Sequence, residues 1–290
     1  MRKVIALALL CPLLFLFCAN VASAASTLDE VKKTGTVIVG IGFDVPPFSY
    51  RDKGQLVGFE IELARAMMPK LEQYVKRPLQ LKLEPVTDET RISWVNSGQI
   101  NMSICHINDT RKRQQMVDFS VPYFWDGKGI LYNQEKLGAK TLKDFAGKTI
   151  GFKRSSSSEG EIQAYFAKME WEKPTLKQFD NHAAGIKALA DGQIDGFTDD
   201  NAIIITVAMM SGYKFGPGQR LNVTDASYSA AHYGIGVQQN DSQWRDVVNY
   251  SLHDLWLSGE YQKMYEKWFG PNSNTPIPLG NNHMDPFVDG

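Results

Sequence analysis

The sequence predicts an α/β fold with two similar lobes, each a mainly parallel sheet flanked by helices. Strand-like and helix-like segments alternate from residue 36 onwards, and strand, helix, strand is the unit of a parallel sheet. The segment NSGQIN at 96–101 is echoed by ADGQID at 190–195, each the end of a helix that turns at glycine into a strand. A chain of 290 residues is long enough for two hydrophobic cores.

The first lobe begins with a β-branched run, TVIVGI at 36–41, which predicts a buried strand. Apolar residues then recur at helical spacing over 59–74, with Pro69 expected to kink or divide that helix. Leucines at 79, 81 and 83 alternate with polar residues, as they do in a second strand.

The second lobe repeats this order, with strands predicted at 149–152 and 175–179 and helices at 161–169 and 183–190. A later strand at 232–237 and one or two amphipathic helices over 244–268 come too late for this series. We therefore expect the chain to return to the first lobe, so that two extended strands join the lobes as a hinge.

The amino terminus has the layout of a cleavable secretory signal. Arg2 and Lys3 precede an apolar stretch at 4–17 that is too short to span a membrane, and small residues follow at 22–24. The expected organisation is a signal peptide at 1–24, lobe 1 at 25–131, lobe 2 at 132–228, a return to lobe 1 at 229–270 and an extended tail at 271–290.

Composition excludes several classes of function. Without Arg2 and Lys3, 29 basic residues stand against 32 acidic ones, so we expect no nucleic-acid partner. Cys105 is the one cysteine outside the signal, which leaves no disulfide and predicts a buried strand residue. The histidines lack zinc-site spacing and no HExxH or GxSxG motif occurs, so no metal, cofactor or catalytic group is expected.

Polar residues gather where the presumed parallel strands end, which is where open α/β sheets bind ligands. These residues are His106, Asn108 and Asp109 after the strand near 100, Ser155 to Ser158 after the strand at 149, and Asp199 and Asp200 after the strand near 194.

Arg113 and Asp200 could hold the carboxylate and the ammonium of an amino acid, since both charges need partners when they leave water. Guanidinium suits carboxylate because its planar fork donates two parallel bonds. Each residue also has a simpler interpretation. Arg113 could be a solvated helix charge beside Arg111 and Lys112, Asp200 a helix N-cap, the serine run a cap, and His182 a surface residue.

Six segments in the same order carry a resemblance to a known family. They are VPPFSY at 45–50, LVGFEIELA at 56–64, GQINMSICHINDTRKRQQMVDFSVPYF at 98–124, DFAGKTIGFKRSSSSE at 144–159, GQIDGFTDD at 192–200 and YEKWFG at 265–270. They resemble the extracytoplasmic solute-binding proteins, family 3, of bacterial amino-acid ABC importers. The resemblance implies the two-lobed periplasmic binding protein fold, a periplasmic monomer, one polar amino acid as ligand and an ABC permease in the inner membrane as partner.

The resemblance also implies roles for particular residues. Arg113 would bind the ligand carboxylate and Asp200 the ammonium. Asn108 and the backbone of His106 would contact the ligand, and Ser156 and Ser157 would close on the carboxylate.

Glutamate/aspartate-binding members are the most similar, which suggests that Arg91 and His182 read an acidic side chain. Two departures leave the side chain open. Gly42 stands where those members have an arginine. Asp88 stands where they have a small hydroxyl residue and where glutamine and basic amino-acid binders have an aromatic one. Lys153 is an additional polar contact.

A second interpretation is an enzyme similar to the cyclohexadienyl (arogenate/prephenate) dehydratases of this fold, with Asp88, Asp44 or His106 as the acid. A third is a ligand-sensing subunit, which the sequence does not separate from a transport protein.

Overall fold

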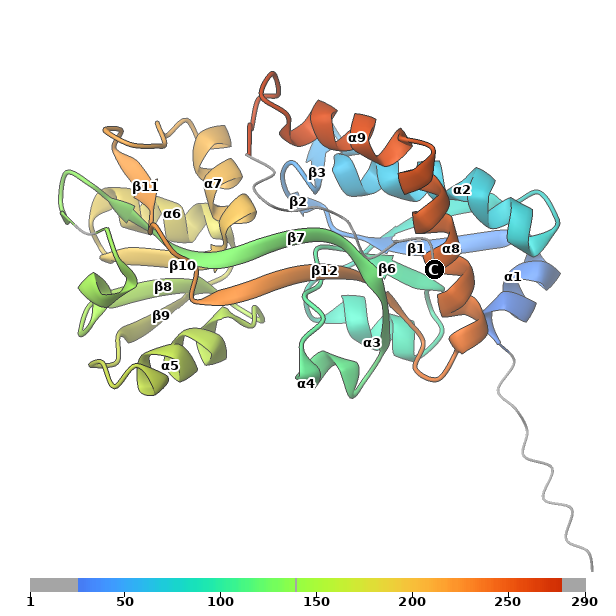
Figure 1. Cartoon of the computed structure of the whole chain (residues 1–290), viewed down its shortest axis with the longest axis horizontal. Coiled ribbons are helices and arrows are strands. Elements are labelled where there is room, and N and C mark those ends of the chain that lie inside the picture. Colours follow the sequence, from blue (N-terminus) through green and yellow to red (C-terminus); the bar gives the residue numbers. More distant parts are fainter. Residues whose placement is uncertain (1–25, 139, 278–290) are drawn as a thin grey trace, which may run out of the picture.

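The computed structural model describes residues 26–138 and 140–277. The expected signal peptide, and residues 278–290 of the expected tail, lie outside the described residues. Figure 1 shows two groups of helices and strands connected by two long strands, β7 (Asp118–Asn133) and β12 (Ser229–Val237). We call the group that contains the N-terminal strands the first lobe and the other group the second lobe.

The first lobe holds parallel strands flanked by helices, as expected. Its strands β1 (Thr36–Ile41), β5 (Gln80–Pro85) and β6 (Met102–Ile104) pair in parallel, with β1 between the other two. Its helices are α1 (Thr27–Thr34), α2 (Phe59–Val75), α3 (Thr90–Asn96), α4 (Arg111–Gln114), α8 (Ser242–Leu257) and α9 (Glu260–Phe269). A small antiparallel sheet of β2 (Asp44–Val45), β3 (Ser49–Asp52) and β4 (Gln55–Val57) was not predicted.

The second lobe repeats this arrangement. Strand β8 (Thr149–Lys153) pairs in parallel with β9 (Thr175–Phe179) and with β10 (Gly196–Asp200). A short strand, β11 (Leu221–Val223), pairs with the end of β7. The helices are α5 (Ser158–Lys168), α6 (His182–Asp191) and α7 (Asn201–Met210), with a 3-10 turn over Leu142–Phe145.

The sheets of the two lobes are hydrogen-bonded into one sheet, with strand order β5-β1-β6-β12-β7-β10-β8-β9. Strand β7 pairs antiparallel with β12 from Asp118 to Lys128, and then with β10 from Lys128 to Tyr132. Lys128 is thus the residue at which pairing passes from one partner strand to the other. The two extended strands expected to join the lobes are β7 and β12. The boundaries between the lobes at 131/132 and 228/229 remain a proposal.

Helix α2 excludes one of the two outcomes expected at Pro69, because the helix is not divided there. Proline removes one hydrogen bond from the helix interior. The apolar face on both sides of it, including Met67 and Leu71, is fully buried, and this packing holds the helix together across the missing bond.

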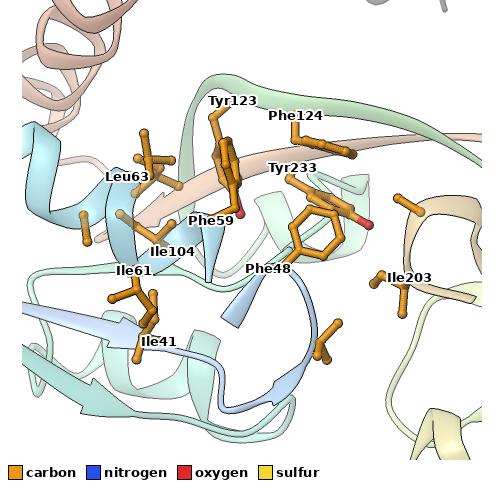
Figure 2. Close-up of a cluster of buried hydrophobic side chains, with 14 of the residues drawn as sticks. Ile41, Phe48, Phe59, Ile61, Leu63, Ile104, Tyr123, Phe124, Ile203 and Tyr233 are labelled. Carbon is orange, nitrogen blue, oxygen red and sulfur yellow. The ribbon is translucent and has the colours of Figure 1, made fainter. Parts of the chain in front are cut away.

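Aromatic side chains fill the first lobe where β7 and β12 leave it. Phe124 on β7 and Tyr233 on β12 stack with ring centroids 5.4 Å apart, and Phe48 meets both rings edge-on. Figure 2 shows this group with Ile203 of α7 facing it from the second lobe. The base of the hinge is therefore a rigid packed core, and the cleft described below lies beside it.

Candidate ligand-binding cleft

All ten residues that the sequence analysis assigned as ligand contacts line one small cavity between the lobes. The cavity is lined by Asp88, Arg91, His106, Asn108, Arg113, Lys153, Ser156, Ser157, His182, Asp199, Asp200 and Ile203. Asp199 and Ile203 are the two members that the sequence did not single out as ligand contacts. The cavity volume is ≈ 20 Å³, which is room for about one water, so the lobes must separate before a larger molecule can enter.

Arg113 is the buried member of the basic triplet. Thr110 caps α4, and Arg111 and Lys112 on that turn are exposed, whereas Arg113 is 9% exposed. Its Nη1 donates to the carbonyl oxygen of Asn108 at 3.0 Å. Among the described residues it forms no ion pair with a carboxylate. Burial, and then repulsion from Arg91, lower the pKa of Arg113 to about 10. The solvated-charge interpretation is therefore wrong for Arg113 and right for its neighbours.

Asp200 lies at the N-cap position of α7, but its side chain makes no capping bond. Instead it accepts from Asn108 Nδ2 at 3.1 Å and from the Tyr233 hydroxyl at 2.7 Å. Burial raises the pKa of Asp200, with attraction from Lys128 opposing the shift. The capping interpretation is wrong because the carboxylate turns towards the cleft.

Lys128 is a residue that sequence reasoning missed. Its side chain is fully buried on β7, where the Nζ atom lies 3.7 Å from Asp200 Oδ1 and 3.3 Å from Glu161 Oε1, and donates to Ser157 Oγ. A single lysine in the run DGKGI carries no pattern that marks it as buried. Only the pairing register places it beside Asp200.

The serine run lies at the start of α5, where it faces the cleft. Ser157 is at the N-cap position without a side-chain capping bond, and the Oγ of Ser156 is buried without a partner. Ser155 Oγ donates to Glu89 of the first lobe at 2.9 Å. The capping interpretation therefore fails for Ser157, and Ser156 keeps an unused hydroxyl beside the cavity.

His182 is buried against Asp199 rather than exposed. Its Nε2 lies 2.9 Å from Asp199 Oδ2, while Ser158 Oγ donates to Asp199 Oδ1 at 3.0 Å. Burial alone would raise the pKa of Asp199, but the hydrogen bond and charge of His182, with Lys128, hold it well below its usual value. The surface interpretation of His182 is wrong, and its ring is engaged within the second lobe.

Asp88 is held by cations from both lobes. Arg91 Nη1 lies 2.9 Å from Asp88 Oδ1, and Lys153 Nζ lies 2.7 Å from Asp88 Oδ2. Against the effect of burial, these two charges hold the pKa of Asp88 well below its usual value. Arg91 also donates to the carbonyl oxygen of Cys105 at 2.8 Å. Asp88 is thus neutralised before any ligand is considered.

His106 lies between two carboxylates. Its ring Nδ1 is 3.6 Å from Glu60 Oε2 and its Nε2 is 3.9 Å from Asp88 Oδ1. Its backbone N–H donates to Glu60 Oε1 at 2.5 Å, in a residue with a φ of 37°. Glu60 is fully buried. No role was predicted for it, because in the sequence it is one charged residue on an amphipathic helix.

Cys105 is buried, as its apolar flanks predict, but it lies directly after β6 and not within a strand as expected. Burial raises the pKa of the Cys105 thiol to about 12. The thiol therefore stays protonated at neutral pH.

Within the described ranges, no group of three histidine, cysteine or acidic side chains is arranged to hold a metal ion. In the same residues, no helix combines the length and the apolarity needed to cross a membrane.

Comparison with known proteins identifies the family. Residues 37–271 match the model of the bacterial extracellular solute-binding proteins, family 3. The chain belongs to this family. The family and the two-lobed α/β fold expected from the resemblance are thereby confirmed, and the protein is a solute-binding protein.

Several individual relatives of this solute-binding protein are amino-acid-binding proteins. It is 30% identical over 218 residues to a glutamine-binding protein of Geobacillus stearothermophilus, covering 74% of this chain and 77% of that one. It is 28% identical over 255 residues to the L-glutamate/L-aspartate-binding protein of Pseudomonas aeruginosa, covering 87% and 81%. A solved ancestral arginine-binding protein bound to arginine superposes with a TM-score of 0.69 at 31% identity, covering 81% of this chain and 99% of that chain.

Proposed function

We propose that this protein binds one polar amino acid between its lobes and delivers it to an ABC permease in the inner membrane. The names of the relatives support an amino acid as the solute. A periplasmic location and a monomeric state belong to the same proposal, which rests on the family's extracellular role.

The observation that carries the proposal is the buried guanidinium of Arg113, which forms no ion pair with any described carboxylate. A buried charge without a counter-ion is costly, so a carboxylate that arrives with the ligand would stabilise it strongly. Such a carboxylate would accept the bidentate bonds for which guanidinium is shaped.

Asn108 connects the two ends of the proposed amino-acid site. Its carbonyl oxygen accepts from Arg113, its Nδ2 donates to Asp200, and its Oδ1 is buried without a partner. A ligand with its carboxylate at Arg113 and its ammonium at Asp200 would lie against this side chain. An amino acid is the common solute that carries both charges on one carbon.

Closure of the two lobes around the ligand follows from the fact that the site residues come from both lobes. Arg113 and Asn108 come from the first lobe and Asp200 from the second, so a ligand that contacts all three favours the closed state. Because the closed cavity is small, the ligand ammonium would replace the direct contact between Asn108 and Asp200.

The dehydratase-like alternative needs a group that can give up a proton to the substrate. Asp88 is bound by Arg91 and Lys153, which hold its pKa well below its usual value, so Asp88 is ionised at neutral pH and is a poor acid. This arrangement favours binding over catalysis. Formation of an aromatic product on incubation with prephenate or arogenate would support the enzyme instead.

Substitution of Arg113 tests the proposed function. We expect Arg113→Ala to weaken amino-acid binding at least about 100-fold, since removing one partner of a buried ion pair costs about 3–5 kcal/mol. Isothermal calorimetry with polar amino acids measures the loss. Arg111→Ala, which removes an exposed guanidinium from the same turn, is the matched control and should bind normally. Near-normal affinity of Arg113→Ala would contradict the proposal.

A further inference from the structure

The start of helix α7 is capped by a residue of strand β7 and not by its own N-cap residue. Asp126 on β7 accepts from the backbone N–H of Ala202 through Oδ2 at 2.7 Å. Ala202 is the second residue of α7, and an N-cap side chain normally accepts from the second or third N–H of its helix. Asp126 therefore makes the bond that Asp200, at the N-cap position, leaves unmade.

Asp200 has the backbone that would let it cap α7 itself. Its φ of −57° and ψ of 131° are typical of an N-cap residue, and aspartate is among the best capping residues. Its carboxylate nevertheless accepts from Asn108 and Tyr233 on the side of the cleft. Because the first N–H groups of a helix attract a carboxylate, Asp200 stays in the cleft more readily when another acceptor occupies the helix start.

Asp126 and Lys128 approach this end of α7 from one face of strand β7. Side chains two residues apart in a strand point the same way, and β7 pairs with β12 without a shift from Asp126 to Lys128. Lys128 Nζ lies 3.7 Å from Asp200 Oδ1, while Asp126 holds the N–H two residues further along the chain. Strand β7 thus holds both the carboxylate of Asp200 and the helix that follows it.

The carboxyl of Asp126 is itself held in place. Its Oδ1 accepts from the N–H of Gly127 at 2.7 Å, so each of its oxygens has a backbone donor. Burial, and then repulsion from Asp200, raise the pKa of Asp126, and the two backbone bonds oppose this shift. The bond from Ala202 needs only a lone pair on Oδ2, which the carboxyl keeps in either charge state.

We propose that Asp126 is a positioning residue for ligand binding. By capping α7 from strand β7, it keeps Asp200 off the helix start and leaves that carboxylate free for the ligand ammonium. The inference rests on the proposed function, in which Asp200 binds the ammonium. No sequence pattern marks this role, because Asp126 stands in the run FWDGKG, far along the chain from the helix that it caps.

Removal of the Asp126 carboxyl would leave the N–H of Ala202 without its acceptor. Asp200 is the residue placed to replace it, by rotation of its side chain towards the helix start. The carboxylate end of the ligand site, at Arg113, belongs to the first lobe and is unchanged. The expected defect is therefore a selective loss of ammonium recognition.

Calorimetry of Asp126→Ala with an amino acid and with its analogue that lacks the α-ammonium group measures this defect. The probe is whichever of glutamine, glutamate, aspartate and arginine binds the wild-type protein most tightly, and glutarate, for example, is the analogue of glutamate. Affinity for the amino acid should fall at least about tenfold, or roughly 1.4 kcal/mol, and affinity for the analogue much less. Equal losses for both ligands, or no loss, would overturn the inference.

Two further variants separate positioning from a general effect on the helix. Asp126→Asn keeps a carbonyl oxygen that can accept from Ala202, so it should retain most of the affinity for the amino acid. Ser227→Ala is the matched control, because it removes the bond that Asn201 Nδ2 donates to Ser227 Oγ at 3.0 Å at the same end of α7. It should affect both ligands equally. A selective loss in Ser227→Ala would mean that any disturbance of the helix start has this effect, and would overturn the inference.

A crystal structure of ligand-free Asp126→Ala tests the position of Asp200 directly. We expect the Asp200 carboxylate to accept from the N–H of Ala202 or Ile203, where Asp126 accepts in the wild type. A carboxylate that still faces the cleft would overturn the inference. Should the alanine variant not fold, Asp126→Val is used in its place, since valine suits a strand and offers no acceptor.

The two measurements distinguish failure of the inference from failure of the proposed function. Binding of none of the four amino acids by the wild-type protein would count against the proposed function. The ligand-free crystal structure would still decide whether Asp126 keeps Asp200 off the helix.

Discussion

Three consecutive basic residues in this chain differ in their exposure to solvent, and the local helix geometry decides which of them is buried. Thr110 starts a turn of helix in which Arg111 and Lys112 face solvent while Arg113 points inwards to the carbonyl of Asn108. The sequence shows the same charge at each position. Only the direction of the turn decides which guanidinium loses its water and therefore needs a ligand carboxylate.

Lys128 is the cation that contacts Asp200 among the described residues. Removing Lys128 should raise the pKa of the Asp200 carboxyl further. Asp199 adds negative charge beside Asp200, and the Tyr233 hydroxyl donates to it. Burial already raises the pKa of Asp200. Without the lysine, the protonated and uncharged form would be favoured further.

We therefore predict that Lys128→Met weakens ligand binding, and that the weakening grows as the pH falls. The ligand ammonium needs the ionised carboxylate, so affinity drops as the pH decreases towards the raised pKa of Asp200, and in the variant the drop begins at a higher pH. Calorimetry between about pH 5 and 8 measures the profile. The exposed Lys136→Met is the control. A uniform loss at every pH would mean that Lys128 acts through packing alone.

At the scale of elements, the spacing of apolar residues correctly predicted the positions of several helices and strands. The β-branched run at 36–41 is strand β1, the segment 175–179 is β9, and the late amphipathic region is the helix pair α8 and α9. Short-range rules failed where packing overrides them. Pro69 does not divide α2, and the two-to-four-residue strands β2 to β4 are too short to give a period.

We predict that alanine substitutions at two glycines, in the consecutive helices α5 and α6, have opposite effects on stability. A Cβ at Gly185 in α6 would lie 2.0 Å from Phe197 Cε2, whereas nothing lies within 4 Å of a Cβ at Gly160 in α5. We expect Gly185→Ala to destabilise the protein by about 1–3 kcal/mol through overpacking. Gly160→Ala should stabilise it by up to about 1 kcal/mol, since alanine is the better helix former.

Urea denaturation of both variants beside the wild type measures the two changes in the free energy of unfolding. Equal effects of the two substitutions would contradict the close approach of α6 to strand β10.

For the whole molecule, the continuous sheet through β7 and β12 predicts a bending motion at a fixed hinge. Aromatic packing anchors the first-lobe end of these strands, and Lys128 joins them to the second lobe. Contacts such as Lys153 with Asp88 and Asn108 with Asp200 are made only when the lobes meet. Ligand binding should therefore shift the population towards a closed form of similar internal structure.

We predict that a saturating amino-acid ligand decreases the radius of gyration in small-angle X-ray scattering and raises the melting temperature. At a ligand concentration of about 1,000 times Kd, binding stabilises the native state by about 4 kcal/mol. The same ligand should change neither quantity in Arg113→Ala, whereas Arg111→Ala should respond as the wild type does. A melting shift without any change in size would contradict closure while leaving binding intact.

The sequence by itself determined the alternation of strands and helices, the internal echo that indicates two lobes, and the family. It also indicated the ten proposed site residues. Hydrophobic periodicity, turn residues and the order of motifs can all be recognised from residues that are close together in the chain. Tertiary structure decided which polar groups meet. Lys128 beside Asp200, Glu60 beside His106, and Lys153 on Asp88 are contacts between residues far apart in the chain. The charge that a ligand encounters is the sum over such contacts, and only the fold brings them within range of one another.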